Sequence, residues 1–348
     1  MTILANRIEN TVRTDEDFVR RIWEPSRPGL QSLINFLDEH HPHSLVVQHN
    51  TGLFSVDWLF QLLLQAQKKD IDTFIFFHNV KELVGTFKES REYLNVIFKA
   101  ATRTFVHSLS DLNLLRTIGE INNVTLFPHG IYDRPKNSVV RSSRIESLPV
   151  GKRIIATYGF LLPHKGIPEL IIAFGQLRME HPNLHLLLVN ALHTNSESIE
   201  ELRKVRRLIS QMGLEDDVTV VHDFLPDSET FDLLESADLV VYPYQRSGES
   251  ASGAVKMGLA SGRPVAVTPL AIFEDIPEDV AYRLPDISSE GITRGLSSLM
   301  GNILLRERLV KNSREYIRER SWDVLSQRLF SIVEGCHQQK IFEKHFKK

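Results

Sequence analysis

Short apolar runs alternate with longer amphipathic stretches along the first half of the chain. Four runs are rich in β-branched and aromatic residues, and we predict them to be strands: residues 44–48 (SLVVQ), 73–77 (TFIFF), 104–107 (TFVH) and 124–127 (VTLF). The stretches between them have the apolar spacing of helices: residues 58–68, 81–99 and 110–118. Strands separated by helices predict a parallel sheet with helices on both faces.

The same alternation resumes after a polar segment that carries two prolines, residues 133–152. The predicted strands are then residues 153–157, 184–189, 218–221, 239–242 and 265–268. The predicted helices are residues 168–179, 196–212, 227–236 and 251–261, followed by 290–304, 309–320 and a last helix from 324 towards 335. A second parallel sheet covered by helices is therefore expected.

The fold class predicted from this pattern is α/β, with two Rossmann-like doubly wound domains that face a cleft. The predicted boundaries are 1–135 for the first domain, 136–150 for a linker, 151–320 for the second domain and 321–348 for a C-terminal helix and basic tail. The tail is read as a solvated helix end rather than a membrane anchor. Ligands of such folds bind at the carboxyl ends of the strands, which here would line the cleft.

Composition narrows the class of protein further. The chain has 348 residues, of which 42% are apolar and 24% charged, and its formal net charge is −3 with both signs interspersed. No basic stripe marks a nucleic-acid binder, so no nucleic-acid partner is expected. With Cys336 as the single cysteine an internal disulfide is impossible, and a reducing cytoplasmic setting is expected. The start turns polar too early for a signal peptide, and no apolar run is long enough for a transmembrane helix. Peripheral contact with a membrane stays open.

Residues 158–166 (YGFLLPHKG) form the first cluster with candidate chemistry. They lie between a predicted strand and a predicted helix, where Gly159 and Gly166 permit tight backbone paths. The helix start offers unpaired N–H groups, and Lys165 adds a cation beside them, which together make a diphosphate cradle. An ordinary turn with a solvated lysine explains the same residues equally well.

Residues 242–265 (YPYQRSGESASGAVKMGLASGRPV) form the second cluster. A strand ends in YPY, and a loop of serines and glycines then enters a helix that Ser250 or Ser252 can cap. Gly253 allows a ligand to approach the backbone closely, and the carboxylate of Glu249 can accept hydrogen bonds from sugar hydroxyls. The alternative is that Glu249 only stabilises the helix dipole.

Taken in order, YGFLLPHKG, ADLVVYPY, GESASGAVKMGLASGRPV and IFEDI resemble the donor domain of the family-4 glycosyltransferases over about residues 150–330. The resemblance implies the GT-B fold, transfer with retention of anomeric configuration and a nucleoside-diphosphate sugar as co-substrate. It implies neither a metal nor another cofactor. The acceptor it suggests is a glycan or a lipid-linked glycan.

Individual residues carry this resemblance. Lys165 matches the lysine that contacts the donor diphosphate, and Glu249 matches the first glutamate of the E-x7-E motif, which holds donor-sugar hydroxyls. Ser252 and Gly253 fall where backbone amides approach sugar and phosphate. Gly159, Gly166 and Ser250 complete the predicted donor-binding set.

The chain departs from the family pattern at two positions of this set. Phe160 stands where a basic residue often follows the glycine. Met257 stands at the second glutamate of E-x7-E, and its thioether cannot accept a ribose hydroxyl. These two departures put ribose recognition and catalytic strength in question, but not the fold.

The first half contributes histidines at predicted strand ends. His78 ends TFIFFHN, and the resemblance suggests a histidine near the reacting centre at such a place. We therefore predict His78, Lys165 and Glu249 as catalytic, although a structural, hydrogen-bonded His78 fits as well. His49 and Asn50, after SLVVQ, are predicted to lie on the acceptor side. HSLS at 107–110 and FPHG at 127–130 also end strands and are expected to line the cleft.

The first domain is expected to be shorter than a usual GT-B amino-terminal domain, because no strand with a glycine-rich turn precedes ILAN at residues 3–6. Upstream strands are absent, belong to a longer parent chain, or are replaced by a partner chain. The predicted function is sugar transfer from a nucleoside-diphosphate sugar to a hydroxyl acceptor. The alternatives are a degenerate GT-B module that binds nucleotide, glycan or a partner subunit, and, less favoured, a GT-B epimerase.

Overall fold

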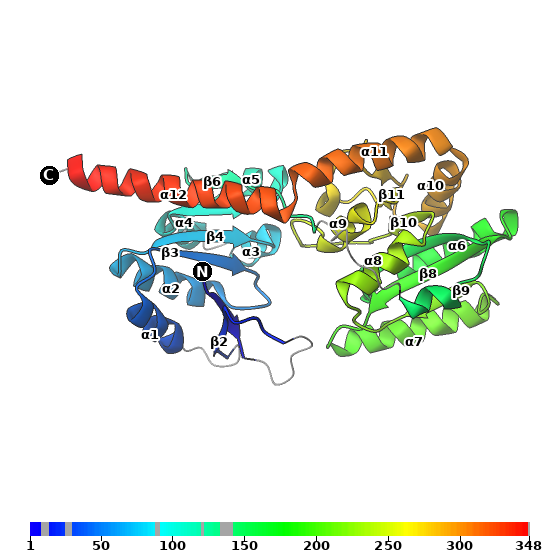
Figure 1. Ribbon diagram of the computed structural model, residues 1–348, viewed down its shortest axis with the longest axis horizontal. Helices are drawn as coiled ribbons and strands as arrows, with labels where there is room; N and C mark the ends of the chain where they lie inside the picture. The colour runs from blue at the N-terminus through cyan, green and yellow to red at the C-terminus, as the bar shows by residue number, and fades with distance from the viewer. Residues whose placement is uncertain (8–13, 25–29, 88–90, 120–121, 133–141, 347–348) are drawn as a thin grey trace. The chain divides into compact units, whose positions relative to one another are not determined.

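The computed structural model describes residues 1–7, 14–24, 30–87, 91–119, 122–132 and 142–346 (Figure 1). The chain divides into two compact units. The first comprises Met1–Phe127, Gly248–Ser250 and Arg328–Lys348, and the second comprises Pro128–Ser247 and Ala251–Gln327. Of the predicted linker, residues 136–141 lie outside the described residues. Ser142, which follows them, donates its backbone N–H to Asp232 within the second unit, at 2.8 Å.

The first unit contains a parallel sheet of four strands in sequence order, β3-β4-β5-β6. These strands are β3 (Ser44–His49), β4 (Asp72–Phe77), β5 (Arg103–Val106) and β6 (Val124–Leu126). They match the four strands predicted in the first half. The helices among them are α2 (Val56–Lys68), α3 (Val80–Thr86), α4 (Arg91–Ala100) and α5 (Leu109–Arg116). The helix predicted over residues 81–99 is thus wrong as one helix, because α3 ends in Gly85 and Thr86, both weak helix formers.

The first unit also contains a separate parallel pair, β1 (Ile3–Asn6) and β2 (Val19–Trp23). β1 is the ILAN segment that resembles a strand in the sequence, whereas the sequence pattern missed β2 and the helix that follows, α1 (Gln31–His40). The signal for α1 was present, since Leu33 and Leu37 are four residues apart and are both buried.

The second unit contains one parallel sheet in the order β12-β11-β10-β7-β8-β9. Its strands are β7 (Arg153–Phe160), β8 (Leu184–Ala191), β9 (Val218–Val221), β10 (Leu239–Tyr242), β11 (Val265–Val267) and β12 (Tyr282–Arg283). Its helices are η1 (Ser143–Ser147), η2 (Pro163–Lys165), α6 (Ile167–Glu180), α7 (Ser196–Gln211), α8 (Asp227–Glu235), α9 (Gly253–Ala260), η3 (Ala271–Phe273), α10 (Ser289–Gly301) and α11 (Ile303–Glu319). All five strands predicted here are present.

Alternate residues of these strands enter two different cores. On β7, Ile155 packs with α6 residues such as Phe174 in one cluster, whereas Ile154 and Ala156 pack with α9 residues such as Leu259 in another. Because successive side chains of a strand point to opposite faces, both faces of the sheet are buried under helices. This two-sided burial explains the continuous apolar runs that marked these strands in the sequence.

The strand order of the second sheet reverses between β7 and β10. From β7 the chain proceeds outward to β8 and β9, and then returns to place β10 on the other side of β7. Connections on either side of such a point leave in opposite directions, which opens a crevice at the carboxyl ends of the two strands. The loops after β7 and β10 are the two clusters that the sequence singled out.

The last helix, α12 (Trp322–Phe346), contributes its C-terminal part to the first unit. Lys340 bonds the carboxylate of Asp72 at 2.7 Å and that of Asp70 at 3.1 Å, and His337 Nδ1 lies 3.1 Å from Asp72. The tail is therefore anchored to the start of β4 through Lys340 and His337, while residues 341–346 are exposed, as expected of a solvated helix end.

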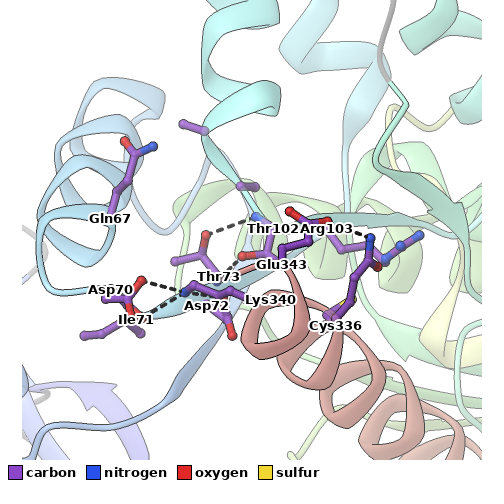
Figure 2. Close-up of a pocket in the computed structure, with 13 residues that line it drawn as sticks. Gln67, Asp70, Ile71, Asp72, Thr73, Thr102, Arg103, Cys336, Lys340 and Glu343 are labelled. Carbon is purple, nitrogen blue, oxygen red and sulfur yellow. Dashed lines mark hydrogen bonds and ion pairs between the residues drawn. The ribbon is translucent and has the colours of Figure 1, made fainter. Parts of the chain in front are cut away.

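A cavity of about 530 Å³ lies beside this anchor (Figure 2). Figure 2 shows Lys340 pointing to Asp70 and Asp72, with Arg103 and Cys336 along the same cavity. Because Asp72 and Arg103 begin their strands, the cavity lies at the amino edge of the sheet, away from the edge that carries His78. Among the described helices, none is long and apolar enough to span a bilayer.

Candidate active site

The loop between β7 and α6 has the geometry of an anion cradle. Gly166 adopts a φ of +72°, and a Cβ at this position would overlap the carbonyl oxygen of Pro243. Only glycine fits both constraints. α6 then begins at Ile167 with Pro168 in its first turn and no side-chain cap. Uncapped amides at a helix N-terminus attract negative charge.

Lys165 ends η2 immediately before Gly166, and its ammonium nitrogen lies 3.9 Å from the centre of the Tyr244 ring. Tyr244 is buried, and its hydroxyl lies 3.3 Å from Ser252 Oγ. Tyr244 therefore joins the two predicted clusters within the second unit. Lys165 is half-buried and pairs with no carboxylate in the part of the chain that the structure describes. Its charge is thus available to an anionic ligand.

His164 precedes Lys165 and does not share this charge. Burial, with the neighbouring charges of Lys165 and Arg246, lowers the pKa of His164 to about 4. The ring is neutral at pH 7, and Lys165 is the cation that this loop presents next to α6.

Ser252 is the cap of α9, since its Oγ accepts from the Val255 N–H at 3.4 Å. Gly253 follows at an exposed position, and a Cβ there would have His129 Nε2, at 3.8 Å, as its nearest neighbour. The helix begins two residues later than predicted. The Ser250 side chain is buried and does not cap α9, whereas its backbone N–H donates to the carbonyl of His78 at 2.9 Å. Glu249, at an exposed position, and Ser250 belong to the first unit.

His129 faces the start of α9, a role that sequence reasoning missed beyond noting FPHG as a strand end. Its Nδ1 lies 2.7 Å from the carbonyl oxygen of Gly130. A carbonyl only accepts, so Nδ1 carries the proton and Nε2 keeps its lone pair. Burial lowers the pKa of His129, as does the charge of Lys256. The ring lies beside Gly253.

The two departures from the family pattern have different surroundings. Met257 is partly buried and packs against the core. Phe160 is 39% exposed and contacts His193 and Phe224, with ring centroids 5.2 and 6.1 Å away. These three residues lie at or beyond the carboxyl ends of β7, β8 and β9, so an aromatic surface occupies the place of the missing basic residue. We call Phe160, His193 and Phe224 the aromatic group.

A buried ion pair lies one residue before Met257. Lys256 pairs with Asp275, and both side chains are more than 90% buried. The Lys256 ammonium also bonds the hydroxyl of Tyr316 at 3.1 Å, and this hydroxyl donates to the backbone carbonyl of Asp275 at 3.1 Å. Burial lowers the pKa of Lys256, while Asp275 opposes the shift. Lys256 thus ties α9 to the segment after η3 through Asp275 and to α11 through Tyr316.

In the first unit, His78 belongs to a chain of side chains at the carboxyl edge of the sheet. Its Nε2 lies 2.8 Å from Gln48 Oε1 and its Nδ1 lies 3.2 Å from His107 Nε2. His107 Nδ1 lies 3.0 Å from the carbonyl oxygen of Phe127. The strand-end histidines 78 and 107 are thus brought together.

His49 and Asn50 do not extend this chain. The His49 ring is fully buried between Phe54 and Phe77, with centroids 5.0 Å from each. Burial lowers the pKa of His49 to about 4, so the ring is a neutral core residue that solvent does not reach. Asn50 Oδ1 accepts from the Gly52 N–H at 2.9 Å and closes a turn. The structure therefore does not support the acceptor-side role predicted for His49.

Solved structures with a similar fold cover almost the whole chain. Sucrose-phosphate synthase from Thermosynechococcus elongatus has a TM-score of 0.72 at 18% identity, covering 99% of this chain and 88% of that chain. The Anabaena protein HepE in complex with UDP and glucose has a TM-score of 0.70 at 14% identity, covering 91% and 86%. A glycosyltransferase from Rickettsia africae has a TM-score of 0.73 at 14% identity, covering 92% and 85%. These likenesses show that the fold is GT-B.

Similarity in sequence covers a little more than half of the chain. A phosphatidyl-myo-inositol mannosyltransferase from Mycobacterium tuberculosis is 23% identical over 205 residues, which are 57% of this chain and 51% of that protein. The chain thus spans about half the length of the curated relatives it matches. The profile of the family "Glycosyl transferases group 1" matches residues 141–316, half of the chain. This region contains η2, α6 and α9, and with them Lys165, Tyr244 and Ser252. Because the family profile matches half of the chain, the protein belongs to the group 1 glycosyl transferases.

Proposed function

We propose that the protein is a retaining glycosyltransferase of family 4. It moves a sugar from a nucleoside-diphosphate sugar to a hydroxyl of a saccharide or lipid-linked saccharide. The observation that carries the proposal is the position of Lys165, whose unpaired ammonium is held over Tyr244 next to the uncapped start of α6. This arrangement lies at the point where the strand order reverses, which is where doubly wound sheets bind nucleotides.

The charge of the reaction fits these groups. Departure of the nucleoside diphosphate leaves negative charge on the β-phosphate. Lys165 and the amides at the start of α6 are positioned before the reaction, so they stabilise that charge without reorganising. Ser252 and Gly253 offer a second helix start.

The aromatic group supports a nucleotide as the leaving group. Two of its members are exposed phenylalanines, and aromatic faces accept the stacking of any nucleobase. HepE was solved with UDP, which agrees with a nucleotide in this fold. We propose the base to lie against Phe160 and Phe224, whereas Met257 leaves the ribose hydroxyls without the usual carboxylate.

The proposals on the acceptor, on membrane contact and on location rest on the name of one relative. The mycobacterial relative is named for transfer to a phosphatidyl-myo-inositol, which favours a lipid-linked acceptor, peripheral membrane contact and a cytoplasmic location as proposals. We also propose a reaction without metal. Turnover that persists after treatment with a chelator supports this, and turnover that is lost and then restored by a divalent cation contradicts it.

A second candidate function is a GT-B module that binds nucleotide, glycan or a partner without catalysis. Met257 in place of the second glutamate favours it. The two functions differ in donor hydrolysis, because slow release of nucleoside diphosphate requires a competent enzyme.

The test combines binding and turnover. A thermal-shift screen of nucleoside diphosphates and their sugars should identify one donor, because a ligand of the native state raises stability by mass action. With that donor, Lys165→Ala should lower hydrolysis by about 100- to 1000-fold, the usual loss when one preorganised donor is removed. Lys311→Ala, at an exposed position on α11, is the matched control. Stabilisation by a nucleotide without any hydrolysis would favour the non-catalytic module, and equal hydrolysis by both variants would remove Lys165 from the site.

A further inference from the structure

Three hydrogen bonds link Gln48, His78, His107 and Phe127, and with the Gln48 amide oxygen facing His78 they require three protons. The Phe127 carbonyl only accepts, so His107 Nδ1 donates to it. Gln48 Oε1 only accepts, so His78 Nε2 donates to it. The 3.2 Å bond between His78 Nδ1 and His107 Nε2 needs one further proton, from either ring. Two neutral imidazoles carry only two.

We propose that His78 and His107 bind one proton more than two neutral imidazoles and share it, so that His78 presents a cationic Nε2–H to an oxygen of the substrate. The Gln48 amide oxygen occupies the position that this substrate oxygen takes. The ligand is an anionic or hydroxyl-bearing group, and this part rests on the proposed function. The proton count does not, because it follows from the three hydrogen bonds with the Gln48 amide oxygen facing His78.

Exposure of the three side chains agrees with these roles. His107 is 5% exposed, whereas His78 is half-buried at the end of β4 and Gln48 is exposed on β3. The shared proton is therefore sheltered on one side, and the Nε2–H of His78 points to the side that a ligand can reach. Displacement of the exposed Gln48 amide by a substrate oxygen keeps every bond of the chain.

The titratable groups around the pair permit a single positive charge. His49 on β3 stays neutral, since burial and the charge of His78 lower its pKa to about 4. Asp111 on α5 has a buried carboxylate, and Glu82 on α3 accepts from the side chain of Asn79, which follows His78. Glu249 adjoins Ser250, whose N–H bonds the His78 carbonyl.

Gln48 and His107 act as positioning residues for His78. If the Gln48 amide rotates by half a turn, its NH2 donates to His78 Nε2, and two protons then satisfy all three bonds. The pair can thus gain or lose its proton while the chain stays intact. Gln48 can accept a hydrogen bond from His78 Nε2 or donate one to it. A carboxylate at position 48 could only accept, and an aliphatic side chain could neither accept nor donate.

Nitrogen-15 NMR of histidine side chains in the full chain counts the ring protons directly. We expect three protonated nitrogens on the pair at low pH and two at high pH, in one coupled step. Gln48→Glu should raise the pKa of the pair by about one unit or more, and its isostere Gln48→Leu should lower it. Two protonated nitrogens from pH 5 to 8, or shifts of the same sign in both variants, would overturn the proposal.

Activity then tests the role toward substrate. The pH profile of donor turnover should move with the NMR pKa in Gln48→Glu and Gln48→Leu. His107→Gln should make His78 titrate alone, and if this variant does not fold, the two Gln48 variants decide. A confirmed proton count with an unmoved pH profile would refute the substrate role while leaving glycosyl transfer intact. Absence of any turnover, with three protons counted, would instead refute the proposed function.

Discussion

Lys165 stacks its ammonium on the ring of Tyr244, although the two residues follow different strands, β7 and β10. The contact fixes the one cation of the β7 loop against a buried ring whose hydroxyl reaches Ser252. Because β7 and β10 are neighbours in the sheet, their loops meet, and the flexible lysine is ordered before any ligand arrives.

Replacing the Tyr244 ring should weaken nucleotide binding through Lys165. Tyr244→Leu removes the cation–π contact, worth about 0.5–2 kcal/mol, and should raise the dissociation constant of the nucleoside diphosphate several-fold. Tyr244→Phe keeps the ring and loses only the contact with Ser252, so it should bind almost as the wild type does. Calorimetry on both variants checks this. If the Phe variant is as weak as the Leu variant, the hydroxyl rather than the ring is what matters.

Glu249 should recognise the donor sugar. Glu249→Gln keeps the shape of the side chain and loses charge-assisted hydrogen bonds, worth about 1.5–3 kcal/mol each. The variant should bind the free nucleoside diphosphate nearly normally and the sugar nucleotide at least tenfold more weakly. Titration with both ligands measures this, with Glu307→Gln at an exposed position on α11 as control. Equal weakening for the two ligands would place Glu249 on the nucleotide instead.

His49 should make the first unit less stable in mild acid. Its pKa is about 4 in the folded chain and about 6.5 when unfolded. Between these values only the unfolded chain binds the proton, so stability is full above pH 6.5 and falls as the pH drops towards 4. The loss amounts to about 3 kcal/mol.

The variant His49→Phe isolates this effect, since phenylalanine keeps an aromatic ring between Phe54 and Phe77 and cannot bind a proton. Urea unfolding at pH 7 and pH 4.5 should show the variant gaining stability relative to the wild type as the pH falls. A constant difference between the two proteins would show that His49 does not carry the pH dependence.

Breaking the buried pair in the second unit should be costly. Lys256→Met leaves the Asp275 carboxylate buried without its cation, which typically destabilises a protein by about 3–5 kcal/mol. The double variant Lys256→Met, Asp275→Leu removes both charges and should recover most of that loss. Denaturant unfolding of the single and double variants measures the difference. A double variant no more stable than the single one would show that the two charges are not coupled.

The features of the candidate site that depend on neighbouring residues in the sequence could be predicted from the sequence alone. Gly166 and Lys165 could be read from YGFLLPHKG, because a glycine between a strand and a helix, with a lysine beside it, acts through its own backbone and its immediate neighbours. The predicted strands of the second sheet were likewise marked by apolar runs of the right length, since burial on both faces leaves few polar positions.

Contacts between distant segments were decided only by the tertiary structure. Nothing near Tyr244 in the sequence shows that its ring lies under Lys165, because that depends on β10 returning to the side of β7. Burial also gave individual residues a different role from the one that the sequence suggests. His49 was expected beside an acceptor but is a neutral core residue, and Lys256 resembles a surface lysine but is paired inside the fold. A side chain's charge depends on its solvent exposure and its partners, and the order of strands determines both.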